Sequence, residues 1–187
     1  MMNQPRPTKA DLLAAAGKTV LDVISPDLNI LFCGINPGLY TAAVGHHFAR
    51  PGNRFWPALY AAGFTPRLLS CYEERELLSY GYGITNLVRR ATASAGEITL
   101  TEYREGGRSL VDRLHEYRPR FLAILGIGAY RSAFDLPKAG FGRQDMKIED
   151  VIVWVLPNPS GLNAHFTLQG LADHLRELKA ASEPFGQ

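Results

Sequence analysis

The sequence predicts an α/β fold, a three-layer α/β/α sandwich built around a mostly parallel central sheet. Two observations lead to this prediction. Short apolar runs, typical of strands that are covered on both faces, alternate along the chain with amphipathic helical segments. The expected strands cover residues 28–33, 83–87, 121–125 and 152–156. Strands that alternate with helices favour parallel pairing, because each helix carries the chain back across one face of the sheet.

The helices are expected before, between and after these strands. They cover residues 8–17, 53–62, 73–79, 99–117 and 167–181. Asn53 has the side chain of a helix N-cap, and Thr99 with Glu102 has the spacing of a capping box. Leucines recur at helical spacing in the last segment, which indicates one buried face. No internal repeat or low-complexity linker interrupts this pattern, so we predict one compact α/β/α unit.

The composition is that of an ordinary globular protein. The chain has 187 residues, of which 46% are apolar and 20% charged, with a net charge of +2. This length suffices to bury a full core, and no run of about 18 apolar residues predicts a membrane span. The opening residues lack the long apolar core of a signal peptide. Fifteen of the 20 basic residues are arginine, the side chain that suits bidentate contact with phosphate.

Cysteine and histidine do not predict a metal site. Cys33 and Cys71 are too few for a disulfide framework or a four-thiolate cluster, and Cys33 lies in an apolar run that predicts burial. The pair His46-His47 resembles half of a metal site, but adjacent side chains point apart in an extended chain. We therefore expect no metal.

Two loops carry the candidate site. Gly34-Ile35-Asn36-Pro37-Gly38 follows the first strand, and Asn158-Pro159-Ser160-Gly161-Leu162 follows the fourth. Glycine and proline fix such turns sharply, and in open α/β sheets ligands bind at the edge where parallel strands end. An asparagine amide can orient a water molecule but does not accept a proton at neutral pH. A hydrolase that relies on Asn36 therefore needs a good leaving group, such as a pyrimidine base leaving as an anion.

With Asn53-Arg54-Phe55-Trp56, these loops resemble the mismatch-specific uracil-DNA glycosylase and thymine-DNA glycosylase family of the uracil-DNA glycosylase superfamily. The resemblance covers roughly residues 20–180. It implies a uracil-DNA glycosylase-like fold, with an N-terminal appendage at 1–24 and one glycosylase domain at 25–187. The implied activity is base excision: uracil, or thymine or another modified pyrimidine, is flipped from a G:U or G:T mispair and its N-glycosidic bond hydrolysed.

The resemblance also implies roles for single residues at the pocket. Asn36 would position the attacking water, Asn158 would be the second catalytic amide, and Phe48 would stack on the flipped base. The other expected substrate contacts are Ile35, Gly38, Asn53 and Asn86. In some relatives a lysine stands where this chain has Asn86, so a charge near the pocket is missing.

A second group of expected residues faces the DNA rather than the base. Flipping a base leaves a gap in the stack, and Leu162 would fill it as an apolar wedge. Gly161 and Asn163 would contact the guanine left on the opposite strand. The candidate phosphate contacts are Arg89, Arg90 and Gly128.

The loop at 89–96 departs from what a fast hydrolase would be expected to have. It contains no carboxylate, and we mark Ala93 as the catalytic-loop position where one is missing, with Ala91 and Ala95 as neighbouring alternatives. Slow chemistry is the resulting hypothesis. A catalytically weak or inactivated module that senses lesions or mismatches in DNA stays open as the alternative.

Other classes are disfavoured. Gly126-Ile127-Gly128 follows a strand but lacks the third glycine of a dinucleotide fingerprint, so it is interpreted as a strand-to-helix turn. Superfamily branches with an aspartate in the first loop or with an iron–sulfur cluster do not fit Asn36 and two cysteines. We expect double-stranded DNA containing uracil or a mismatched pyrimidine as the partner, no cofactor, no membrane, a monomer, and a cytoplasmic, nucleoid-associated location of bacterial type.

Overall fold

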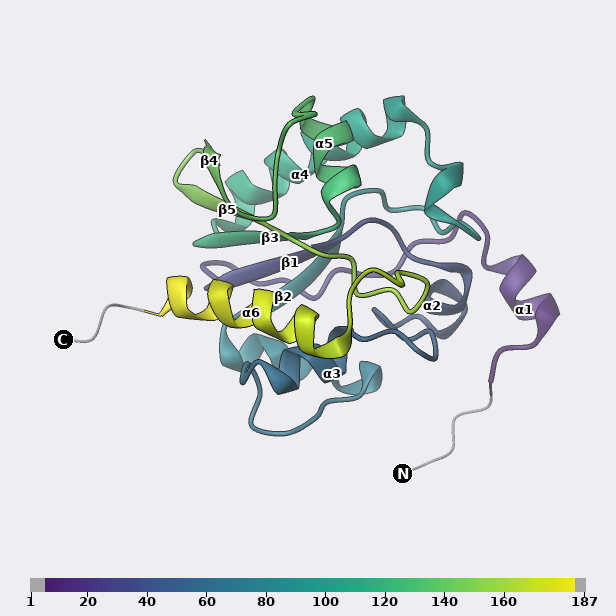
Figure 1. The fold of residues 1–187 in the computed structure, drawn as a ribbon. Coiled ribbons are helices and arrows are strands. Elements are labelled where there is room, and N and C mark those ends of the chain that lie inside the picture. The colour runs from purple at the N-terminus through teal and green to yellow at the C-terminus, as the bar shows by residue number, and fades with distance from the viewer. Residues whose placement is uncertain (1–5, 184–187) are drawn as a thin grey trace.

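The computed structural model describes residues 6–183, and its centre is a single five-stranded sheet (Figure 1). The strands are β1 (Ile30–Gly34), β2 (Tyr82–Asn86), β3 (Phe121–Leu125), β4 (Gly142–Ile148) and β5 (Val151–Leu156). Their order across the sheet is β2-β1-β3-β5-β4, with parallel pairing except between β4 and β5. The predicted three-layer α/β/α sandwich with a mostly parallel sheet is thus confirmed.

Helices cover both faces of this sheet (Figure 1). They are α1 (Lys9–Ala14), α2 (Leu39–Val44), α3 (Phe55–Ala61), α4 (Leu100–Tyr117), α5 (Ile127–Phe134) and α6 (Leu168–Ser182), with 3₁₀ segments η1 (Cys71–Tyr80) and η2 (Ala95–Glu97). One core lies between the sheet and α3, η1 and α6, and the other between the sheet and α4 and α5. No helix within residues 6–183 is long and apolar enough to cross a membrane.

The apolar strand β1 contributes to both cores. Ile30 and Phe32 belong to the core under α3 and α6, whereas Leu31 and Cys33 belong to the core under α4. Neighbouring strand residues point to opposite faces, so a strand covered on both sides needs a continuous apolar run. Cys33 is buried as predicted, and burial raises the pKa of its thiol to about 12.

Most expected elements are present, and the exceptions have clear causes. The capping box of Thr99 and Glu102 opens α4, and Thr167 caps α6. Residues 73–79 form part of a 3₁₀ helix rather than an α-helix. Strand β4 was not predicted, because its sequence is polar and alternates between partly buried and exposed positions, as edge strands commonly do. Helix α2 was also missed, since six residues show no clear helical period.

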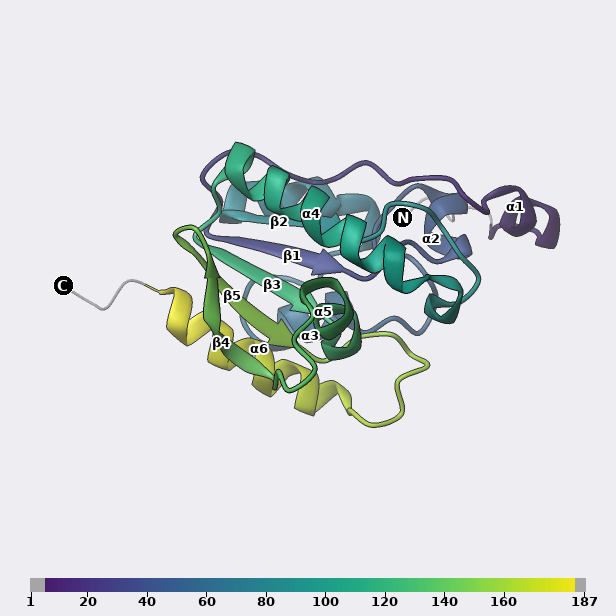
Figure 2. The same ribbon diagram turned by 90° about the horizontal axis from the view of Figure 1, so that it is seen from above.

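The four parallel strands end at the same edge of the sheet, where the loops after β1, β2, β3 and β5 gather (Figure 2). The segment before β1 reaches this edge as well. The N–H of Gly17 donates to the carbonyl of Ala91 (2.9 Å), and the N–H of Ala91 donates to the carbonyl of Lys18 (2.8 Å). Val23 pairs with Ile84 of β2 in an antiparallel bridge. Main-chain hydrogen bonds therefore join residues 17–23 to β2 and to the loop that follows it.

Candidate functional site

A cavity of about 420 Å³ lies at this edge of the sheet. The predicted site residues that line it are Ile35, Asn36, Gly38, Phe48, Asn53, Asn86, Ala93, Asn158, Leu162 and Asn163. Residues of the β1, β2 and β5 loops thus meet around one hollow, together with residues 47–53. Its volume falls in the range of small-molecule sites, which is about 300–1,000 Å³.

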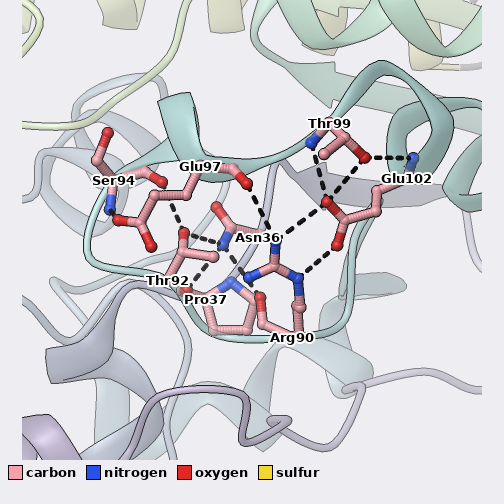
Figure 3. A network of polar contacts seen from close by, with 8 residues as sticks. All are labelled: Asn36, Pro37, Arg90, Thr92, Ser94, Glu97, Thr99 and Glu102. Carbon is pink, nitrogen blue, oxygen red and sulfur yellow. Dashed lines mark hydrogen bonds and ion pairs between the residues drawn. The ribbon is translucent and has the colours of Figure 1, made fainter.

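The amide of Asn36 is held in one orientation (Figure 3). Its Nδ2 donates to the hydroxyl of Thr92 (2.8 Å) and to the carbonyls of Arg90 and Pro37 (both 3.1 Å). Carbonyl oxygens only accept, so the atom that faces them must be the nitrogen. Every hydrogen bond of this amide within residues 6–183 runs through Nδ2, and Oδ1 stays available as an acceptor at the cavity.

Thr92 links the loops after β1 and β2. Its hydroxyl accepts from Asn36 and donates to the carbonyl of Ser94 (2.8 Å), while its backbone N–H donates to the carbonyl of Pro37 (3.2 Å). The hydroxyl proton is thus already committed, which fixes the direction of the Asn36 contact. The loop at 89–96 supplies polar support for Asn36.

The two arginines of this loop differ in what they do. The guanidinium of Arg90 pairs with Glu102 on α4, with Nη2 3.0 Å from Oε2, and Nη2 also donates to the carbonyl of Glu97 (3.1 Å) (Figure 3). Arg90 and the capping residue Thr99 hold the pKa of Glu102 at about 2. Arg90 is therefore already paired within the protein although its side chain is partly exposed, whereas Arg89 is exposed.

The three alanines of the loop are not equivalent. Ala93 and Ala95 are exposed and line the cavity. Ala91 is buried in a small cluster with Ala15, Val20 and Ala42, so a carboxylate there would enter a core rather than the site. The first carboxylate after the loop, Glu97, accepts from the backbone N–H of Ser94 (2.9 Å) as part of a capping box.

His47, whose pairing with His46 resembles half of a metal site in the sequence, forms part of the cavity wall together with Asn86. Its Nε2 donates to the carbonyl of Leu21 (2.9 Å), so Nδ1 accepts from Asn86 Nδ2 (3.4 Å). This pattern requires the neutral imidazole. Burial lowers the pKa of His47 and outweighs the opposing effect of the nearby Glu74 carboxylate.

Phe48 has an unusual backbone and a fixed ring. Its φ is +54°, in the left-handed region that aromatic residues rarely adopt, and its ring stacks on Phe55 with centroids 4.0 Å apart. Buried Glu74 holds the preceding residues, because its carboxylate accepts from His46 Nδ1 (2.8 Å) and from the backbone N–H of His47 (2.7 Å). The geometry presents Phe48 at the cavity as a rigid aromatic surface.

Gly34 makes room at the end of β1 for this arrangement. A Cβ at Gly34 would lie 2.7 Å from Asn86 Oδ1 and 3.5 Å from the ring of Phe48. Only a residue without a side chain permits both neighbours at that strand end.

The loop after β5 is stiffened by its own side chains. Asn158 Oδ1 accepts from the N–H of Ser160 (2.9 Å), which leaves Asn158 Nδ2 as a donor at the cavity. Asn163 Nδ2 donates back to the carbonyl of Asn158 (3.0 Å). Leu162 stands at the tip of this loop with 73% of its surface exposed. A Cβ at Gly161 would lie 2.5 Å from the Gly52 carbonyl, so the two loops touch through their backbones.

Of the predicted site residues, Gly161, Arg89, Arg90 and Gly128 do not line this cavity. Gly128, in the first turn of α5, lines a neighbouring hollow of about 600 Å³ and not the cavity. Asn53 lines the cavity, but its Oδ1 also accepts from the N–H of Phe55 (2.9 Å) at the start of α3. Among residues 6–183, no group of three or more His, Cys, Asp or Glu side chains could hold a metal ion.

Comparison with protein families agrees with this geometry. Residues 21–180, most of the chain, match the family model of the Uracil DNA glycosylase superfamily. The match spans the whole sheet and all the loops around the cavity. The chain therefore belongs to the uracil DNA glycosylase superfamily, whose members are DNA glycosylases.

Proposed function

We propose that the protein is a monofunctional glycosylase that removes uracil from G:U mispairs in double-stranded DNA and leaves an abasic site. Thymine in G:T mispairs and other modified pyrimidines are further proposed substrates. The proposal includes a monomeric state and a cytoplasmic, nucleoid-associated location of bacterial type. The observation that carries it is the Asn36 amide, which lines the cavity and is held through its nitrogen, so that Oδ1 has no hydrogen-bond partner within residues 6–183.

Asn36 Oδ1 would act by orienting water. A fixed acceptor accepts a hydrogen bond from a water molecule and directs the oxygen lone pair at the anomeric carbon of the sugar, and the proton that the water loses goes to the departing pyrimidine anion or to solvent. An amide does not remove the proton, so most of the bond breaking must precede attack, with an oxocarbenium-like sugar and a departing pyrimidine anion. This mechanism suits uracil, whose anion is a good leaving group.

The opposite side of the cavity supports the departing base. Asn158 Nδ2 is available as a donor, because Asn158 Oδ1 is occupied by Ser160. A fixed donor near a pyrimidine carbonyl oxygen stabilises charge as it develops there. Phe48 supplies a flat surface for the ring, held by stacking on Phe55.

The residues around the cavity favour hydrolysis over lyase chemistry. Among the described residues that line it, none carries a carboxylate or a lysine ammonium group. A Schiff base needs an amine nucleophile. Uracil-containing duplex should therefore remain unbroken until alkali is added.

The preference for guanine opposite the target is proposed to depend on Gly161. The backbone N–H of Asn163 donates to the Ser160 carbonyl (2.9 Å), and its side-chain Nδ2 donates to the Asn158 carbonyl. The contact with guanine therefore falls mainly to the backbone of Gly161, next to the exposed Leu162. Faster release from G:U than from A:U duplex supports this assignment, and equal rates would contradict it.

Single-turnover base release from a G:U duplex, with alkali to reveal abasic sites, tests the proposed activity. Asn36→Ala should reduce the rate of base release by at least about 100-fold, because the attacking water is then no longer oriented. Asn29→Ala is the matched control, since Asn29 precedes β1 and donates to the Ser182 carbonyl. Selective binding of G:U duplex without any base release would instead support the lesion-sensing module.

A further inference from the structure

Arg54 holds the loop that carries Leu162. Its Nη2 donates to the carbonyls of Ser160 (2.6 Å) and Asn163 (2.8 Å), and its Nη1 donates to the carbonyl of Phe166. The backbone N–H of Arg54 donates to the Pro159 carbonyl (3.0 Å). Two of these acceptors flank Leu162 in the chain, so one side chain fixes the backbone on either side of the exposed leucine.

The chemistry of these contacts requires a guanidinium. Its donors lie in a rigid planar fork, whereas a lysine ammonium is a single point on a flexible stem. All side-chain hydrogen bonds of Arg54 within residues 6–183 go to main-chain carbonyls, and its buried Nε has no partner there. A buried donor without a partner lowers stability. The hydrogen bonds of the guanidinium thus attach the start of α3 to the main chain on both sides of Leu162.

We infer that Arg54 is a positioning residue for the Leu162 wedge, an assignment that rests on the proposed function. With Arg54 in place, the loop is ordered before DNA arrives, and Leu162 enters the base stack without further ordering of the chain. Without it, the loop must be ordered at the moment of binding, which costs affinity and speed. Arg54 acts on base flipping through Leu162 and does not touch the reacting atoms.

A double-mutant cycle tests this coupling. Arg54→Gln should lower single-turnover release of uracil by about 10- to 100-fold in the parent. In the Leu162→Ala background, Arg54→Gln should lower the rate of uracil release by less than about threefold, because the wedge is already lost. If Arg54→Gln reduced the rate by the same factor with leucine and with alanine at position 162, the inference would be overturned. Arg54→Lys, which keeps the charge but loses the fork, should behave like Arg54→Gln, and full activity of Arg54→Lys would also overturn it.

Hydrogen exchange gives a readout that does not depend on catalysis. In Arg54→Gln, amides of residues 157–166 should exchange at least about tenfold faster, with the sheet unchanged. Unchanged exchange in this loop would refute the positioning role. If the parent releases no base, the proposed function fails, and the cycle is then measured as affinity for an abasic duplex. Additive effects on that affinity would overturn the inference.

Arg176→Gln is the matched control for loss of an arginine. Arg176, on α6, donates to the Ala61 carbonyl (2.7 Å) at the end of α3, and it does not line the cavity. The Arg176→Gln variant should leave the rate of base release and the hydrogen exchange of residues 157–166 unchanged. Thermal unfolding of all variants is measured in parallel, so that a general loss of folding is separated from the loop effect.

Discussion

Asn36 and Thr92 are 56 residues apart in the chain, yet the Asn36 amide nitrogen lies 2.8 Å from the Thr92 hydroxyl oxygen. The contact joins the loop after β1 to the loop after β2. Because Thr92 in turn donates to Ser94, a change in the second loop alters the direction of the Asn36 oxygen without touching it. The orientation of the proposed water therefore depends on both loops.

Removing the Thr92 hydroxyl should slow base release while leaving the fold intact. Thr92→Val keeps the shape of the side chain but removes the shortest of the three contacts of Asn36 Nδ2, together with the hydroxyl's hydrogen bond to the Ser94 carbonyl, so the amide is held less tightly. We expect the single-turnover rate on G:U duplex to fall by about 10- to 100-fold. Thr92→Ser should retain most of the rate. A Thr92→Val enzyme as fast as the parent would show that the hydroxyl does not orient Asn36.

Gly34→Ala should disturb the base pocket from the strand end. The added Cβ would meet Asn86 Oδ1 at 2.7 Å, which forces the Asn86 side chain to move. Overpacking of this kind costs about 1–3 kcal/mol, and chemical denaturation measures it. Base release should also fall, because Asn86 lines the cavity. Gly140→Ala, where nothing lies within 4 Å of the new Cβ, is the control and should change neither quantity.

The buried neutral His47 should make stability fall in mild acid. Burial lowers its pKa in the folded state, so the unfolded chain takes up a proton at a higher pH, near 6.5. The contribution of neutral His47 to the free energy of unfolding is therefore complete above about pH 6.5, and it is lost as the pH falls toward the pKa of His47 in the folded state. The free energy of unfolding is compared at pH 7.5 and 5.5 in the parent and in His47→Gln. An equal decrease in both proteins would contradict this prediction.

Truncation distinguishes two parts of the N-terminal segment. Helix α1 buries no side chain, whereas Ala15 and Val20 are buried against Ala91, and Gly17 and Lys18 pair with Ala91 through the backbone. Deleting residues 1–14 should leave the rate of base release within about threefold. Deleting residues 1–20 should reduce it by about tenfold, because the support of the Thr92 loop is lost. Equal rates for the two deletions would show that residues 15–20 do not support the loop.

The sequence predicted the parts of the fold that local patterns determine. Strands β1, β3 and β5 are almost wholly apolar because both of their faces are covered, and Thr99 and Thr167 mark helix starts by capping. The loops with Asn36 and Asn158 were predicted to meet because parallel strands end at one edge. Strand β4 and helix α2 were missed because an exposed edge and a six-residue helix carry weak periodic signals.

The contacts that orient the site could not be read from local sequence. Arg54 belongs to the Asn53-Arg54-Phe55-Trp56 motif, but the carbonyls to which its side chain donates lie more than 100 residues further along the chain. Arg90 stays a predicted phosphate contact, but its ion pair with the Glu102 carboxylate on α4 could not be read from the local sequence. His47 looked like half of a metal site until Leu21 and Asn86 specified its tautomer. Such roles depend on which distant groups the fold brings together.

The partners of Arg54 in the wedge loop are all main-chain carbonyls. Main-chain groups are the same for nearly every amino acid, so this attachment does not depend on the side chains of the loop. A substitution at position 162 can therefore leave these hydrogen bonds in place, whatever the size or polarity of the new side chain. Because the side chains of Asn158 and Asn163 also stiffen the loop, a library limited to position 162 is the direct test of whether that side chain sets lesion preference.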